Sequence, residues 1–200
     1  MPIMRSMKEL LKMAERIKNE ELRKKTVSIL KNPTLSNSNF SGKHSKFENA
    51  PASLNWHHVY DGGLAEHTLS VTRMSVRIAQ VLKSVYGIEA DMDVLIAGCL
   101  LHDIGKVFEY IKSGGDWDSS DILLDHTMLG TSELYARGFP PEVIHMVASH
   151  FGDKGPTPPM TIEAKILSNI DLFDAELESE ASSEEESISL LDLIKDARSK

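Results

Sequence analysis

The sequence has little of the chemistry that stabilises secreted or membrane proteins. It contains one cysteine, Cys99, in 200 residues, which excludes a disulfide framework and cysteine-rich zinc sites. The longest apolar run, Val94 to Leu101, is too short to cross a bilayer. Lys8, Glu9 and Lys12 interrupt the N-terminus where a signal peptide needs an apolar stretch. We therefore expect a cytoplasmic protein without a membrane span.

A net positive charge is also missing. The chain carries −8 at pH 7, and an acidic protein binds nucleic acid poorly through its overall field. The charge is uneven: residues 1–50 carry +6, from 11 basic and 5 acidic residues, and residues 51–200 carry −14, from 11 and 25. Two interpretations of the basic segment stay open, a solvated amphipathic helix or an arm that contacts phosphate groups.

Strand patterns are almost absent, whereas apolar residues recur at helical spacing along most of the chain. We expect helices over residues 5–31 (with a break near Asn19), 62–82, 94–104, 124–137, 140–150 and 161–177. Segments rich in Ser, Asn, Gly and Pro predict loops at 33–55, 111–120 and 152–160. Six acidic residues between positions 176 and 186 predict a mobile linker. A short amphipathic helix over 188–197 follows it.

This pattern predicts an all-α protein with six or more helices around one core. A length of 200 residues favours one domain with short appendages. We divide the chain into a basic helical arm and loop (1–50), a central helical domain (51–178), and an acidic linker with a short helix (179–200). The two terminal segments are the candidates for self-association or for docking to a partner.

Histidines gather near the expected helix ends, next to acidic or small residues. His102 and Asp103 follow the most apolar segment of the chain, where a buried carboxylate beside an imidazole is costly unless something compensates it. A bound metal ion is the most direct compensation, and imidazole with carboxylate suits Mn, Fe, Ni, Co or Zn. Four other expected helices can present a side chain to the same centre of a bundle: His67, His126, His150 and Asp171. Taken singly, each histidine also has a structural interpretation.

Five segments carry a resemblance to a known family. They are HHVYDGGLAEHT (57–68), LLHDIGK (100–106), DHTMLG (125–130), SHFG (149–152) and EAKILSNIDLFDA (163–175). Together they resemble the HD-domain metal-dependent phosphohydrolases, and within them the HD domain of the YhaM-type 3′→5′ exoribonucleases, over roughly residues 45–178. The resemblance implies that residues 51–178 form an HD-domain helical bundle, flanked by the N-terminal helical arm and the acidic C-terminal extension.

The resemblance also implies roles for individual residues. The ligands of a first divalent ion are matched by His67, His102, Asp103 and Asp171, and those of a second by His126 and His150 with Asp103 as the bridge. Lys106 matches a lysine beside the phosphate, where it can donate to a non-bridging oxygen; a surface lysine is its alternative.

The reaction that the resemblance implies is attack of a metal-activated hydroxide on a phosphodiester. The expected substrates are RNA 3′ ends, short oligonucleotides or small nucleotides. Two alternatives stay open: a nucleoside monophosphate phosphatase, and a non-catalytic metal-binding HD scaffold.

Two features depart from the YhaM pattern. The motif Ser-His-His-Gly has Phe151 here in place of its second histidine. Because phenylalanine cannot bind metal, the second site is expected to be weaker, to fill only with substrate, or to be absent. Residues 1–50 also lack the alternating strands of the OB-type domain with which those enzymes bind single strands.

Further residues are candidates for substrate contact or support. His57 and His58 precede the His67 helix and are expected to contact the substrate phosphate, with packing as their alternative. Lys154, in the proline-rich loop, is a second candidate for a phosphate contact. Asp125 is expected to cap a helix or to orient His126, and Asp174 to play a structural or orienting role.

Overall fold

Helices form most of the regular structure in the computed structural model, which describes the backbone of residues 2–40 and 44–198 and the side chains of residues 6–40 and 44–182. The α-helices are α1 (Pro2–Ala14), α2 (Glu20–Lys31), α3 (Gly63–Tyr86), α4 (Met92–Leu101), α5 (Lys106–Glu109), α6 (His126–Ala136), α7 (Pro141–Ser149) and α8 (Ile162–Arg198). Two short 3₁₀ helices, η1 (Ser38–Phe40) and η2 (Gly152–Lys154), and a hairpin of β1 (Tyr110–Ser113) and β2 (Asp116–Ser119) complete them. The all-α prediction is confirmed apart from this hairpin.

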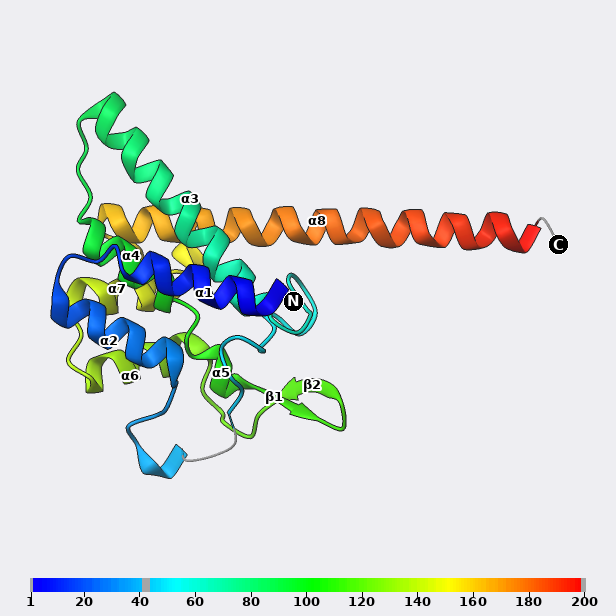
Figure 1. The fold of residues 1–200 in the computed structure, drawn as a ribbon, viewed down its shortest axis with the longest axis horizontal. Helices are drawn as coiled ribbons and strands as arrows, with labels where there is room; N and C mark the ends of the chain where they lie inside the picture. Colours follow the sequence, from blue (N-terminus) through cyan, green and yellow to red (C-terminus); the bar gives the residue numbers. More distant parts are fainter. Residues whose placement is uncertain (1, 41–43, 199–200) are drawn as a thin grey trace.

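Helix α4 lies at the centre of the bundle (Figure 1). Every residue from Leu95 to Leu101 is buried, because α4 packs against α1, α2, α3, α7 and α8. The Asp91 side chain caps the helix by accepting from the backbone N–H groups of Asp93 and Val94. Gly98 allows α7 to approach closely, since a Cβ there would overlap the Met146 side chain. His102 and Asp103, which directly follow α4, therefore lie in the interior.

The N-terminal helices share this core. Leu10, Ile17, Ile29 and Leu30 are almost completely buried and belong to the same apolar cluster as residues of α4 and α7. The expected break between the two helices is present, with Asn19 capping α2 through its side chain. The backbone of residues 18 and 19 is also tied to α4, where both carboxylate oxygens of Asp93 accept N–H groups at 2.8 Å. The basic arm is therefore packed on the bundle.

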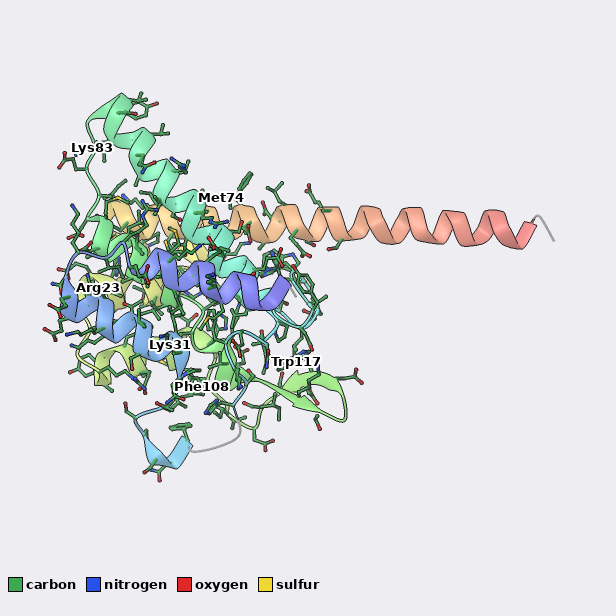
Figure 2. The ribbon with its side chains drawn as sticks, in the orientation of Figure 1. Arg23, Lys31, Met74, Lys83, Phe108 and Trp117 are labelled. Carbon is green, nitrogen blue, oxygen red and sulfur yellow. The ribbon has the colours of Figure 1, made fainter. Side chains whose placement is uncertain are left out.

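Residues 111–120, expected to be a polar loop, contain most of the hairpin. Its strands are antiparallel, with Tyr110 opposite Ser119 and Ser113 opposite Asp116. Gly114 and Gly115 have φ of 62° and 106°, the backbone of a tight two-residue turn. Trp117, labelled in Figure 2, donates from its indole Nε1 to Asp61 at 2.7 Å. That bond fixes the hairpin to the segment that leads into α3.

Helix α8 is longer than expected. The acidic segment 176–186 is helical, and α8 continues without interruption to Arg198, so the predicted linker is wrong as secondary structure. The chain from 162 to 198 contains no glycine or proline, and glutamate is a good helix former. Figure 1 shows the C-terminal half of α8 extending away from the other helices. The side chains of the expected amphipathic segment 188–197 lie outside the described residues.

Although α8 is long, neither it nor any other helix in the described part of the chain has the length and apolar character needed to span a membrane.

The shared core makes the stability of the whole molecule depend on α2. We expect Ile29→Ala to lower the free energy of unfolding by about 2–4 kcal/mol, because it removes a fully buried side chain and leaves a cavity. Urea titration followed by circular dichroism measures this loss. Lys24→Ala, on the exposed face of the same helix, is the control and is expected to change the value by less than about 0.5 kcal/mol. An equally small effect of Ile29→Ala would show that α2 is not part of the cooperative unit.

Candidate active site

Six side chains that the sequence singled out meet at the centre of the bundle, from five separate places in the chain. His67 comes from α3, His102 and Asp103 follow α4, His126 begins α6, His150 follows α7, and Asp171 lies on α8. All are buried except Asp171, which is partly open. They form two groups, and the ligand atoms of each group are close enough together to bind one ion.

The first group consists of His67, His102 and Asp171. The Nε2 atoms of the two histidines are 3.3 Å apart, and they lie 3.0 Å and 3.4 Å from Asp171 Oδ1. Asp103 Oδ2 is 3.5 Å from His67 Nε2 and 3.3 Å from His102 Nε2. Four candidate ligand atoms therefore surround one point.

The second group consists of Asp103, His126 and His150. Asp103 Oδ1 lies 3.4 Å from His126 Nε2 and 3.7 Å from His150 Nε2. Asp103 thus turns one oxygen toward each group, and this carboxylate is positioned to bridge two ions.

The separations within the two groups fit divalent metal ions. Donor atoms that each lie about 2.1 Å from one ion are about 3.0 Å apart at octahedral angles and about 3.4 Å apart at tetrahedral angles. Both oxygens of Asp103 and the Nε2 atoms of His126 and His150 are buried without a hydrogen-bond partner. Buried polar atoms are rarely left in that state, and two ions in these places would satisfy all four.

Each of the four imidazoles is held by its other nitrogen. The Nδ1–H of His102 donates to Cys99 O at 2.8 Å, and that of His150 donates to Val147 O at 2.7 Å. His67 Nδ1 donates to Asp174 at 2.7 Å, and His126 Nδ1 donates to Glu109 at 2.8 Å. Since Nδ1 carries the proton in each neutral ring, the lone pair is on Nε2 and available to a metal ion.

The electrostatics of the groups depend on the buried carboxylates. Burial acts to lower the pKa of His102, but Asp103 and Asp171 outweigh it and raise that pKa to about 10. Burial acts to raise the pKa of Asp103, yet Lys106 and His102 hold it well below its usual range. Burial lowers the pKa of His150 to about 4. In the metal-free protein, protons and Lys106 therefore balance the carboxylates, and metal binding would release protons.

Lys106 lies next to Asp103 and is only 7% exposed, so it is not a surface lysine. Its Nζ is 2.7 Å from Asp103 Oδ2, and it lines a cavity of about 650 Å³ that also exposes Asp103, His126, His150 and Asp171. Gly105, just before it, allows close approach of α6, because a Cβ there would overlap the carbonyl oxygen of His126. The cavity size is within the range of sites that bind small molecules.

His57 and His58 take different places beside this cavity. His57 is part of the wall, and burial lowers its pKa to about 3, so its ring is neutral. The wall does not include His58; its Nδ1 is 3.1 Å from His57 Nδ1, and its backbone N–H donates to Glu178 on α8 at 2.7 Å. His58 has a positive φ of 47°, which is unfavourable for a residue with a Cβ. The bond to Glu178 helps to hold it there.

The remaining candidates also have defined places. Lys154, on η2, lies on the cavity wall. Asp125 caps α6 by accepting from the backbone of Met128 at 2.9 Å, and Asp174 orients His67. His145 accepts from the backbone N–H of Met160 and, like His44, lies outside the groups of candidate ligands; a third such group joins His57, His58 and His67.

Four residues in or beside the site are not among the sequence predictions: Glu109, Glu178, and the aromatic residues Trp56 and Tyr110 of the cavity wall. Glu109 ends a four-residue helix, where no periodicity marks it. Trp56 adjoins His57, and that adjacency was the available signal.

Bridging by Asp103 predicts how metal content responds to substitution. Although Phe151 supplies no ligand, Asp103, His126 and His150 still form the second group, so we expect the purified protein to hold two equivalents of divalent metal. We expect His126→Gln to hold one and Asp103→Asn less than one, because Asp103 faces both groups. Elemental mass spectrometry after dialysis measures the content. Asp116→Asn, on the exposed hairpin, is the matched control and should keep both ions. Equal loss in His126→Gln and Asp103→Asn would contradict two sites that share one carboxylate.

Glu109 is expected to support the second ion by fixing the His126 ring. In Glu109→Gln the side-chain amide can donate to Nδ1, which favours the tautomer whose Nε2 carries the proton. We expect about ten- to hundredfold weaker binding of the second ion, measured by titrating metal-free protein with Mn²⁺ in a calorimeter. Glu142→Gln on the exposed side of α7 is the control. A weakened first ion with an unchanged second would be inconsistent with this role.

Comparisons with known proteins agree with this geometry. The HD domain family matches residues 64–176. A dihydroneopterin 2′,3′-cyclic phosphate phosphodiesterase of Methanocaldococcus jannaschii is 50% identical over 173 residues, which are 86% of this chain and 70% of that protein. The 3′-5′ exoribonuclease YhaM of Listeria monocytogenes is 35% identical over 144 residues, and that of Bacillus subtilis 32% over 148.

The chain spans less than half of these exoribonucleases, 44% and 46% of their lengths. No solved structure matches the chain significantly. The family match covers more than half of the chain and contains all six convergent side chains. The chain therefore belongs to the HD-domain family of phosphohydrolases.

Proposed function

We propose that the protein is a metal-dependent phosphodiesterase that hydrolyses a small cyclic phosphodiester, of the kind named for its relative in M. jannaschii. One observation carries the proposal: buried Asp103 turns one oxygen toward each of two histidine groups, on the wall of a cavity that Lys106 also lines. Two ions bound there would supply Lewis acidity and lower the pKa of a water molecule. In hydrolysis of a cyclic diester, the water oxygen bonds to phosphorus, one ring P–O bond breaks, and the released oxygen takes a proton.

The residues of the chain have separate parts in this reaction. Asp103 fixes the distance between the two groups. Lys106 is placed to donate to a non-bridging phosphate oxygen, where negative charge grows as the water attacks. His57 and Lys154 are proposed contacts of the phosphate or its substituent, because both lie on the wall of the same cavity. His58 is proposed to act through His57.

The size of the cavity and the charge around it favour a small substrate. A volume of about 650 Å³ fits a nucleotide-sized molecule. Proteins that hold single strands use positively charged grooves, whereas this wall combines Lys106 and Lys154 with three aspartates, Asp103, Asp153 and Asp171. Trimming of RNA 3′ ends is the second candidate function, and the similarity to the YhaM exoribonucleases supports it.

Hydrolysis of a defined set of substrates tests the proposal. With Mn²⁺ we expect turnover of 2′,3′-cyclic nucleotides and dihydroneopterin 2′,3′-cyclic phosphate, slower turnover of bis-p-nitrophenyl phosphate, and little of p-nitrophenyl phosphate or a single-stranded RNA. Lys106→Ala should lower kcat about 10²- to 10³-fold, and Lys106→Arg should retain part of the activity. Lys112→Ala, on the exposed hairpin, is the control.

Three outcomes would reject the proposal. Release of mononucleotides from RNA without turnover of cyclic phosphates would favour the exoribonuclease. Cleavage of monoesters alone would favour a nucleotidase. Inactivity toward every substrate despite two bound ions would favour a non-catalytic scaffold.

A further inference from the structure

Two aromatic side chains on the wall of the active-site cavity are partly exposed. Trp56 and Phe151 both line the cavity, and their side chains are 49% and 44% exposed. Aromatic side chains that line a concave site are suited to ligand binding. The two come from different parts of the chain, the loop before α3 and the turn after α7, yet they share one cavity with the candidate metal centre.

The position of Trp56 is fixed by its own loop. The hydroxyl of Ser53 accepts from the backbone N–H groups of Asn55 and Trp56, at 3.3 Å and 3.1 Å. The Trp56 ring stands edge-on to His57, with 5.0 Å between ring centroids and an angle of 90°. Trp56 is therefore held beside a histidine of the cavity wall while about half of its surface stays open.

Phe151 lies directly against the second group of candidate ligands. Its ring centroid is 4.6 Å from that of His150 and 5.2 Å from that of His126. A group that rests on the exposed part of this ring lies near Asp103, which the same cavity exposes. Phe151 therefore lies beside the candidate metal centre.

The cavity that contains the Trp56 and Phe151 side chains limits what can bind against them. They line a cavity of about 650 Å³, which is too confined for the flat surface of a partner protein. A planar ring system is a chemically matched occupant, because every heteroaromatic ring has a face that stacks on Trp or Phe. The apolar residues Pro159 and Leu172 extend the same wall.

We propose that Trp56 and Phe151 form a binding site for the planar heteroaromatic part of the substrate, such as a purine or a pterin, while its cyclic phosphate lies at the metal centre. This inference rests on the proposed phosphodiesterase function and names the class of substrate that the site selects. Cyclic phosphodiesters without an aromatic ring are then poor substrates because they leave this surface uncovered.

Two substrates with the same five-membered cyclic diester test the selection. We expect Trp56→Ala and Phe151→Ala each to raise KM for guanosine 2′,3′-cyclic phosphate about tenfold or more. The KM for glycerol 1,2-cyclic phosphate should change less than about twofold. Trp56→Phe should restore most of the affinity for the guanosine compound. Tyr135→Ala, an exposed aromatic on α6 outside the cavity, is the matched control.

A binding measurement separates this inference from the proposed function. The chain has two tryptophans, so Trp117→Phe leaves Trp56 as the reporter. In EDTA, which prevents metal-dependent turnover, guanosine 2′,3′-cyclic phosphate should quench its emission saturably, and glycerol 1,2-cyclic phosphate should not. Saturable quenching supports the ring site even if the metal-loaded enzyme fails to hydrolyse the compound.

Two kinds of result would contradict binding of the heteroaromatic ring by Trp56 and Phe151. An equal rise of KM for both substrates in the alanine variants would show that the two rings only support the metal centre. An unchanged KM for both substrates would overturn the proposed binding of the ring by Trp56 and Phe151. So would an enzyme that hydrolyses the guanosine compound although Trp56 emission does not respond to it. Either result would leave the phosphodiesterase proposal intact.

Discussion

The burial of one shared carboxylate is the constraint on which the rest of the structure depends. Asp103 is 2% exposed, and Lys106 is the cation that pairs with it. An ionised carboxylate in the interior is strongly unfavourable unless charges and donors surround it. In this fold the Lys106 Nζ lies 2.7 Å from Asp103 Oδ2, and imidazole rings surround the carboxylate on both sides. The C-terminal ends of α4 and α7, the start of α6 and the N-terminal parts of α3 and α8 converge on this group.

Two of the candidate metal ligands, His102 and His150, are oriented by the same kind of hydrogen bond to the end of the preceding helix. His102 follows α4 and donates Nδ1–H to the carbonyl of Cys99, three residues earlier, and His150 follows α7 and donates to Val147 in the same relation. The last carbonyls of a helix have no partner within it, so a histidine at that position satisfies one of them and fixes its own tautomer. His67 and His126 lie within helices and need carboxylates instead, Asp174 and Glu109.

The predictable part of the site was the part that local sequence determines. His102 and Asp103 follow a segment so apolar that burial of both was unavoidable, and the conflict between burial and charge pointed to metal. Glu109 could not be found in this way, because its role depends on α6 returning beside a four-residue helix. The pairing of Tyr110 with Ser119 was hidden by the polar sequence of β2. In α8, a run of acidic residues suggested a mobile linker, although nothing in it breaks a helix.

The turn after α7 connects substrate recognition to the metal centre. His150 is buried toward Asp103, and the next residue, Phe151, faces the open cavity. Gly152 then takes a positive φ of 59°, and a Cβ there would overlap the hydroxyl of Ser168 on α8. Ser168 is one helical turn before Asp171, a candidate ligand of the first ion. Phe151, which we propose to contact the substrate, is thus joined to candidate ligands of both ions through one tight junction. We therefore expect a side chain added at Gly152 to disturb the metal geometry, whereas truncation of the Phe151 ring leaves the backbone of the junction in place.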